Sequence, residues 1–197
     1  MPDPLVHLSD LAENAVSDIR LVAHVYGVVR RADIATWRAG RFGGPEDGFG
    51  DRTTQLAVAN IVGIVEQYAE SVLLDAGCKP GSITSWPNKI KAWSKSFSAA
   101  IEDDCPSFTP MWGFYDARNA IMHRRGELTH SQRKSDVYNR LTAAEVARVG
   151  YDIVVTEAMV GRCAEVCVKC IQELDGTLPS RLVTPPALVE AGPRPEQ

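Results

Sequence analysis

The stretch ARNAIMHRRG, residues 117–126, combines chemically active side chains with a composition that favours a helix. Arg118, Asn119 and His123 alternate with alanine, isoleucine and methionine. Arginine binds anionic oxygens in a planar fork, and histidine is the side chain that most readily changes charge near neutral pH. Either this segment is a core helix with a polar edge, or these polar residues are the functional part of the molecule.

The same region is basic, although the whole chain is acidic with a formal net charge of −4. Residues 118–140 contain six arginines and lysines against two acidic residues, and also include His123 and His130. A local excess of positive charge favours an anionic ligand. The negative total argues against a protein that coats nucleic acid without specificity.

Helical spacing divides residues 110–126 into two faces, and each of them carries apolar or aromatic side chains. One face, which we expect to contact the core, holds Phe114, Ala117 and Ile121. The roughly opposite stripe holds Trp112, Asp116, Asn119 and His123. An ordinary surface helix has a single apolar face. The sequence therefore predicts that a second element or a partner covers this stripe.

The residues RNAIMH, Arg118-Asn119-x-x-x-His123, resemble the R-x4-6-H motif of the HEPN superfamily, named for nucleotide binding in higher eukaryotes and prokaryotes. The commonest form of that motif has a polar residue, often asparagine, directly after the arginine, as here. The segment VEQYAESVLLDAGC, residues 65–78, is similar to an earlier HEPN helix with its acidic and aromatic pattern.

The resemblance implies a metal-independent endoribonuclease that needs no cofactor. In such an enzyme the RNA 2′-hydroxyl attacks the adjacent phosphorus and leaves a 2′,3′-cyclic phosphate. Arg118 would hold the phosphate, His123 would transfer a proton, and Asn119 would orient the imidazole or the phosphate. The neighbouring residues expected to bind substrate are Tyr115, Asp116, Arg124 and Arg125.

The resemblance also implies partners. HEPN proteins resemble toxins of toxin–antitoxin pairs and components of antiviral defence, and they are usually homodimers with two motifs facing each other across a cleft. We therefore expect RNA as substrate, a second copy that meets the helix of residues 110–126, and an antitoxin or other regulatory protein. Arg118 and His123 diverge by about 140° around an ideal helix, which independently favours a site shared by two chains.

The main alternative is a noncatalytic HEPN-like helical module that binds a nucleotide, an RNA or a protein partner. In that interpretation Arg118 is a structural ion-pair partner of Glu66 or Glu70, and His123 is a surface or interfacial residue. The two interpretations differ in whether Arg118 and His123 converge on an open, positively lined cleft. Burial of His123, or a structural hydrogen bond to its ring, would favour the module.

The elements that position these residues are predicted from apolar periodicity, which is helical almost throughout. It predicts an all-α fold, an antiparallel bundle of four to five long helices in one domain over residues 5–177. The first helix follows a Ser9 N-cap and reaches residue 29, and the next two cover residues 58–77 and 86–101. The fourth begins with Thr109 as N-cap and Pro110 in its first turn and ends at Gly126.

The connections are less regular. A Gly-rich loop is expected at residues 39–50, a polar basic loop at 127–141 and a disordered Pro-rich tail at 178–197. TAAE, residues 142–145, has the form of a capping box that begins a short helix, and YDIVV, residues 151–155, is typical of a strand. Thr156 is the expected N-cap of a last helix that ends at residues 175–176.

Composition limits the remaining classes. Cys163, Cys167 and Cys170 follow the spacing of one helix face, so we interpret them as buried packing residues and favour this over a metal or redox site. No uninterrupted apolar run has the length of about 20 residues that spans a bilayer, and the N-terminus lacks the pattern of a secretory signal. The expectation is a cytoplasmic protein.

Overall fold

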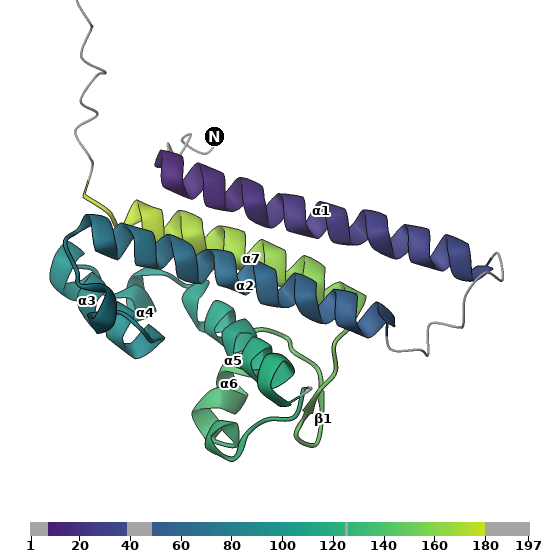
Figure 1. Ribbon diagram of the computed structural model, residues 1–197. Coiled ribbons are helices and arrows are strands. Elements are labelled where there is room, and N and C mark those ends of the chain that lie inside the picture. The colour runs from purple at the N-terminus through teal and green to yellow at the C-terminus, as the bar shows by residue number, and fades with distance from the viewer. Residues whose placement is uncertain (1–7, 39–48, 125, 180–197) are drawn as a thin grey trace, which may run out of the picture.

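The computed structural model describes residues 8–38, 49–124 and 126–179, and nearly all its regular structure is helical. Three long helices, α1 (Asp10–Arg38), α2 (Phe49–Asp75) and α7 (Glu157–Gly176), lie along one another, with α5 (Phe108–Arg124) beneath them (Figure 1). The predicted all-α class is confirmed. The bundle is not antiparallel throughout, because α2 and α7 run in the same direction and α1, the third long helix, opposes them.

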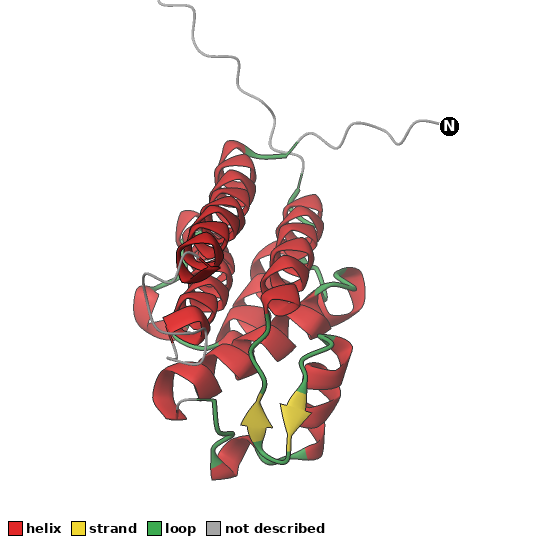
Figure 2. Cartoon of the chain, turned by 90° about the vertical axis from the view of Figure 1, so that its right-hand side faces the viewer, coloured by secondary structure: helices red, strands yellow, loops and turns green. Residues whose placement is uncertain are grey.

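The smaller elements lie at one end of this bundle and beneath it. Helices α3 (Trp86–Phe97) and α4 (Ile101–Asp104) lie at one end, after the 3-10 turn η2 (Pro80–Ser82). Helix α6 (Ser135–Ala143) and a small antiparallel hairpin of β1 (Arg148–Val149) and β2 (Asp152–Ile153) lie below α5 (Figures 1 and 2).

Asp175, near the end of α7, joins three of the long elements. Its carboxylate accepts hydrogen bonds from the Ser9 backbone N–H at 2.8 Å, the Ser9 hydroxyl at 2.5 Å and the Tyr68 hydroxyl of α2 at 2.9 Å. The Ser9 Oγ in turn accepts from Ala12 N–H, so the predicted N-cap is confirmed. The helix that follows is longer than predicted and continues to Arg38.

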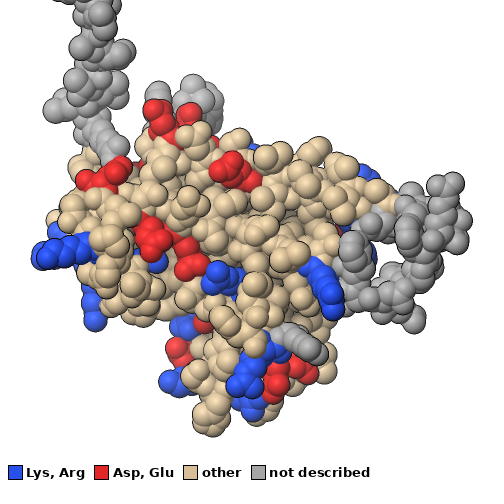
Figure 3. Space-filling view, in the orientation of Figure 1, with Lys and Arg blue, Asp and Glu red and all other residues tan. Residues whose placement is uncertain are grey.

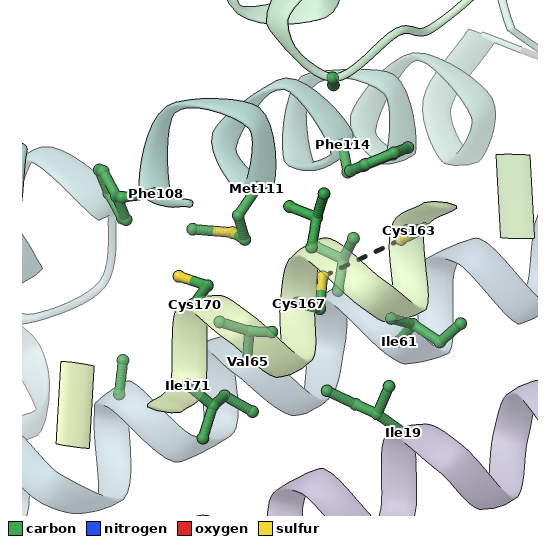
Figure 4. Packing of buried hydrophobic residues seen from close by; sticks show 14 of the residues in the cluster. Ile19, Ile61, Val65, Phe108, Met111, Phe114, Cys163, Cys167, Cys170 and Ile171 are labelled. Carbon is green, nitrogen blue, oxygen red and sulfur yellow. Dashed lines mark hydrogen bonds between the residues drawn. The ribbon is translucent and has the colours of Figure 1, made fainter. Parts of the chain in front are cut away.

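The core fills the space between α1, α2, α5 and α7 (Figure 4). Cys163, Cys167 and Cys170 are fully buried there, and the Sγ atoms of Cys163 and Cys167 lie 4.0 Å apart. Burial raises the pKa of the Cys167 and Cys170 thiols well above the ordinary value, which keeps them protonated and unreactive. Their predicted role as packing residues is confirmed.

Helix α2 is the central element of the core and contacts α1, α3, α5 and α7. Residues 52–75 are long and apolar enough to cross a membrane by length and composition, and half of that window is buried inside the protein. A core helix of a globular bundle has the same property, because it is apolar on most of its faces.

Several predicted boundaries are wrong by a few residues. Helix α3 stops at Phe97 because Ser98 adopts a left-handed conformation, and Ile101 begins the separate α4. Helix α5 begins at Phe108, one residue before the predicted N-cap Thr109. Ser107 precedes it and is held by Glu173 of α7, which accepts from the Ser107 N–H and hydroxyl.

The predicted end of α5 is confirmed at Gly126. Its φ of +103° is in the left-handed region, and its N–H bonds to the Ala120 carbonyl six residues earlier. The predicted Thr156 cap of α7 is also confirmed, since its side chain accepts a hydrogen bond from the Met159 N–H.

The predicted polar loop over residues 127–141 is wrong. It contains a 3-10 turn, η3 (His130–Gln132), and most of α6, which buries Val137 and Leu141 against the rest of the chain. A helix of nine residues needs only these two apolar anchors, too few for the periodicity to reveal it. TAAE ends α6 and does not start a helix, and the strand predicted at YDIVV is confirmed only for Asp152 and Ile153.

Parts of two predicted irregular segments lie outside the described residues. Of the Gly-rich loop 39–50, only Phe49 and Gly50 are described, and both belong to α2. Of the Pro-rich tail 178–197, only residues 178–179 are described.

Candidate functional site on helix α5

Helix α5 is held from three sides, by α2, α6 and α7. The closest approach is at Gly113, where a Cβ would lie 2.7 Å from the Arg140 carbonyl carbon and would overlap the Arg140 oxygen. The absence of a side chain at Gly113 therefore allows the end of α6 to rest directly on the α5 backbone.

This contact covers Trp112 and Asp116, the first half of the stripe that the sequence predicts to be covered. The Arg140 Nε donates to the Asp116 carboxylate at 2.8 Å, and its guanidinium lies over the Trp112 ring at 4.5 Å. Burial raises the pKa of Asp116, an effect that the Arg140 hydrogen bond and charge oppose. The predicted second covered surface is thus provided in part by α6 of the same chain, and Asp116 faces Arg140.

Arg118 lies on the side of α5 that faces α2. Its Nη1 donates to the Asn119 Oδ1 at 3.2 Å and lies 3.6 Å from the Glu66 Oε2. Its Nε is buried with no hydrogen-bond partner, although 31 % of the side chain is exposed. The structure therefore brings two of the three predicted catalytic residues together, Arg118 and Asn119, and adds Glu66.

Glu66 is one of two carboxylates in a small charged cluster. Burial is the largest influence on the pKa of Glu66 and raises it above its ordinary value. The charges of Arg118 and Lys89 lower this pKa, and that of Glu70 raises it. Lys89 of α3 is almost completely buried and pairs with Glu70 at 3.5 Å. The cluster thus holds two cations and two anions.

Lys89 was missed by the sequence interpretation. It falls three residues after Trp86 and four before Trp93, on the same helical stripe as these two buried tryptophans. That spacing is a signal of a lysine directed towards the core. Its position next to carboxylates on α2 could not be predicted, because it depends on the tertiary fold.

The remaining predicted site residues lie at the C-terminal end of α5. His123 and Arg124 are exposed, and no described residue forms a hydrogen bond or ion pair with the His123 ring. Tyr115 is half-buried against the core, and Arg125 lies outside the described residues. Neither burial nor a structural hydrogen bond therefore restrains His123.

The basic character of residues 118–140 is largely neutralised in the fold. Arg118 faces Glu66, Arg133 pairs with Glu127 at 2.6 Å, and Arg140 bonds Asp116 as well as Asp136. Among the described basic residues of this run, Arg124 and Lys134 remain exposed without such a pair. The local excess of positive charge is therefore smaller than the sequence suggests. These residues do not form the positively charged cleft lining that the ribonuclease interpretation expects.

An open groove of about 520 Å³ crosses the outer face of α2, between α1 and Arg118 of α5. Its α2 side includes Asn60, Gly63 and Gln67, which share one helical face, and its α1 side includes Asp18 and Leu21. Most of the surface over α1 and α2 in Figure 3 is neither acidic nor basic.

Large exposed apolar side chains lie at helical spacing from the groove-lining residues on three helices. They are 45–58 % exposed and consist of Leu21, Val25 and Val28 on α1, Leu56 on α2 and Met122 on α5. We call them, with the groove, the α1–α2–α5 face. Exposed apolar side chains that share one face favour an interaction surface.

Within the described part of the chain, no group of three or more histidine, cysteine or acidic side chains is arranged to hold a metal ion. Comparisons with protein-family models, with curated proteins and with solved structures each gave no match.

Proposed function

We propose that this protein is a HEPN-like, metal-independent endoribonuclease whose site is the exposed C-terminal half of α5. The observation that carries the proposal is the position of Arg118, whose partly exposed guanidinium lines an open groove beside Asn119 and five residues before the exposed His123. A phosphate in this groove could be bound through two parallel hydrogen bonds, which a guanidinium forms well.

In the proposed reaction Arg118 binds the scissile phosphate and stabilises the charge that develops on its oxygens. The RNA 2′-hydroxyl oxygen bonds to phosphorus, the bond to the 5′-oxygen breaks, and a 2′,3′-cyclic phosphate forms. His123 supplies a proton to the leaving oxygen, a role that suits an unrestrained imidazole. Asn119 holds the Arg118 guanidinium through the 3.2 Å contact, and Arg124 attracts the RNA backbone.

We further propose that the active form is a homodimer that uses the α1–α2–α5 face. Arg118 and His123 point in directions about 140° apart on α5, so a second α5 brings complementary groups to each phosphate. The exposed apolar side chains of this face supply the association energy.

The cell context follows from this proposal. A cytoplasmic ribonuclease of this type acts on RNA as a toxin or as a defence component, and an antitoxin or another regulatory protein restrains it. The exposed α5 end, with His123 and Arg124, is then the surface that such a regulator covers.

The competing function is a noncatalytic helical module. The Arg118–Glu66 ion pair favours it, because a neutralised arginine stabilises the contact between α5 and α2 without any role in catalysis. Neutralisation of most of the basic run also weakens the general attraction of RNA. A module of this kind binds RNA, a nucleotide or a protein and leaves RNA intact.

The decisive experiment incubates the purified protein with a panel of labelled structured RNAs in EDTA, and identifies the fragment ends. We expect cleavage with 2′,3′-cyclic phosphate ends, and a loss of about 100-fold or more in Arg118→Ala and His123→Ala. The matched control is Arg148→Ala, an arginine of β1 whose guanidinium stacks on the Tyr138 ring of α6. If the wild-type protein binds these RNAs but leaves every one intact, the noncatalytic module is correct.

A further inference from the structure

We propose that Glu66 is the general base of the cleavage reaction, which accepts the proton of the attacking 2′-hydroxyl. This inference rests on the proposed ribonuclease function and adds a catalytic residue from α2 to the motif on α5. A transesterification of this kind needs a group that takes a proton and a second group that gives one. The motif itself provides a single histidine for these two tasks.

The first support is position. The Glu66 carboxylate lies 3.6 Å from the Arg118 guanidinium, so a phosphate held by Arg118 brings its neighbouring ribose within reach of this carboxylate. Glu66 retains 22 % exposure of its side chain and is accessible to a bound substrate. Glu70, one turn further along α2, is paired with Lys89. Glu66 is therefore the carboxylate available next to Arg118.

The second support is direction. Glu66 approaches Arg118 from α2, whereas His123 lies about 140° further around α5. In an in-line displacement the attacking and leaving oxygens lie on opposite sides of phosphorus. In the proposed homodimer, a base on the α2 side of Arg118 and an acid supplied by His123 of the second copy match that requirement.

The third support is the environment of the carboxylate. Partial burial raises the pKa of Glu66 and makes it a stronger proton acceptor than a fully solvated glutamate, while the charges of Arg118 and Lys89 lower this pKa. The charge of Glu70 on the same helix raises it further. A carboxylate whose pKa is shifted by burial and by a specific charge partner beside a groove is a candidate functional group.

Protons and bonds balance in the proposed step. The proton of the 2′-hydroxyl moves to the Glu66 carboxylate while the 2′-oxygen bonds to phosphorus. The bond between phosphorus and the 5′-oxygen breaks, and that oxygen takes a proton from the His123 imidazolium. The products are a 2′,3′-cyclic phosphate, a free 5′-hydroxyl, a neutral Glu66 and a neutral His123, and proton exchange with water restores both residues.

The test compares Glu66→Gln and His123→Ala on two substrates, an oligoribonucleotide and uridine 3′-(4-nitrophenyl phosphate). The amide oxygen introduced by Glu66→Gln would still accept a hydrogen bond from Arg118, so this substitution preserves positioning and removes proton acceptance. The nitrophenolate group leaves without protonation. We expect Glu66→Gln to lower the cleavage rate by about 100-fold or more on both substrates. The rate loss caused by His123→Ala should be smaller on the nitrophenyl ester than on the oligoribonucleotide.

The pH profile of kcat/KM provides the second readout. We expect the wild type to lose activity as pH falls and Glu66 becomes protonated, and Glu66→Gln to lack this acidic limb. Glu70→Gln is the matched control and should keep the rate at neutral pH. It should also keep an acidic limb, moved to lower pH because the charge of Glu70 raises the pKa of Glu66. Circular dichroism and Tm establish that each variant is folded.

Three results would overturn the assignment. If Glu66→Gln retains activity within about threefold of the wild type, or keeps the acidic limb, Glu66 only positions Arg118. If its loss disappears on the nitrophenyl ester, Glu66 is the acid. If the wild-type protein cleaves neither substrate, the ribonuclease proposal itself fails, and the role of Glu66 fails with it.

Discussion

Replacement of Gly113 by alanine tests whether α6 rests directly on α5. Alanine in a helix interior is favoured over glycine by about 1 kcal/mol, so propensity alone predicts a more stable protein. The new Cβ, however, would lie 2.7 Å from the Arg140 carbonyl carbon and 2.8 Å from the Ala144 Cβ, and would overlap the Arg140 oxygen. Comfortable contacts of this kind need about 3.5–4.0 Å, so α6 must move back by about 1 Å.

That displacement decides whether Gly113→Ala raises or lowers the free energy of unfolding. Overpacking of this size costs about 1–3 kcal/mol, and a shift of Arg140 also stretches its 2.8 Å hydrogen bond to Asp116, which is worth about 1.5–3 kcal/mol as a charged pair. After the propensity gain is subtracted from these two costs, we expect Gly113→Ala to lower the free energy of unfolding by about 1.5–5 kcal/mol.

The assay is urea unfolding followed by circular dichroism, with Gly161→Ala as the matched control. Gly161 lies in α7, and a Cβ there would meet nothing within 4 Å. We therefore expect Gly161→Ala to raise the free energy of unfolding by about 1 kcal/mol. Equal stabilisation by both substitutions would refute the close contact between α5 and α6.

Three further predictions concern the charged groups. Asp116→Ala leaves the partly buried Arg140 guanidinium without its shortest partner, and we expect a loss of about 3 kcal/mol in urea unfolding, with Asp136→Ala as a nearly neutral exposed control. Asp175→Ala removes the acceptor of three hydrogen bonds that join α1, α2 and α7; we expect a loss of about 2–3 kcal/mol and faster amide exchange in the first turn of α1. For Glu66, the folded pKa is raised above 4.5, so its contribution to stability is fully present below pH 4.5 and is lost as pH rises through the folded pKa. The stability of Glu66→Gln relative to the wild type should therefore improve between pH 4.5 and pH 7, and an unchanged difference would contradict the raised pKa.

The parts of the fold that could be predicted are those that depend on helical periodicity and local backbone geometry. The core stripe of α7, with its three cysteines, and the Gly126 ending of α5 depend on local spacing and local backbone geometry, and both are present. Helix α6 was missed because its stability comes from contacts with α5, among them the Arg140 stacking on Trp112, and not from its own pattern.

The candidate site likewise has features that the local sequence shows and features that depend on tertiary contacts. The spacing of Arg118, Asn119 and His123 is visible in the sequence, and so are Glu66 and Glu70 as candidate partners of the arginine. Which glutamate pairs with Arg118 depends on the axial offset between α2 and α5, which no local pattern encodes. The pairing of Arg133 with Glu127 and of Arg140 with Asp116 likewise required the tertiary fold, and it removes most of the apparent basic patch.

The central claim, that the exposed end of α5 cleaves RNA, is tested most directly by the rate of RNA cleavage in EDTA for the wild type, Arg118→Ala and His123→Ala side by side. The account predicts fragments with 2′,3′-cyclic phosphate ends from the wild type, and rates lower by about 100-fold or more in both variants while their unfolding curves stay cooperative. Cleavage at the same rate by all three proteins, or intact RNA in every reaction, would contradict it.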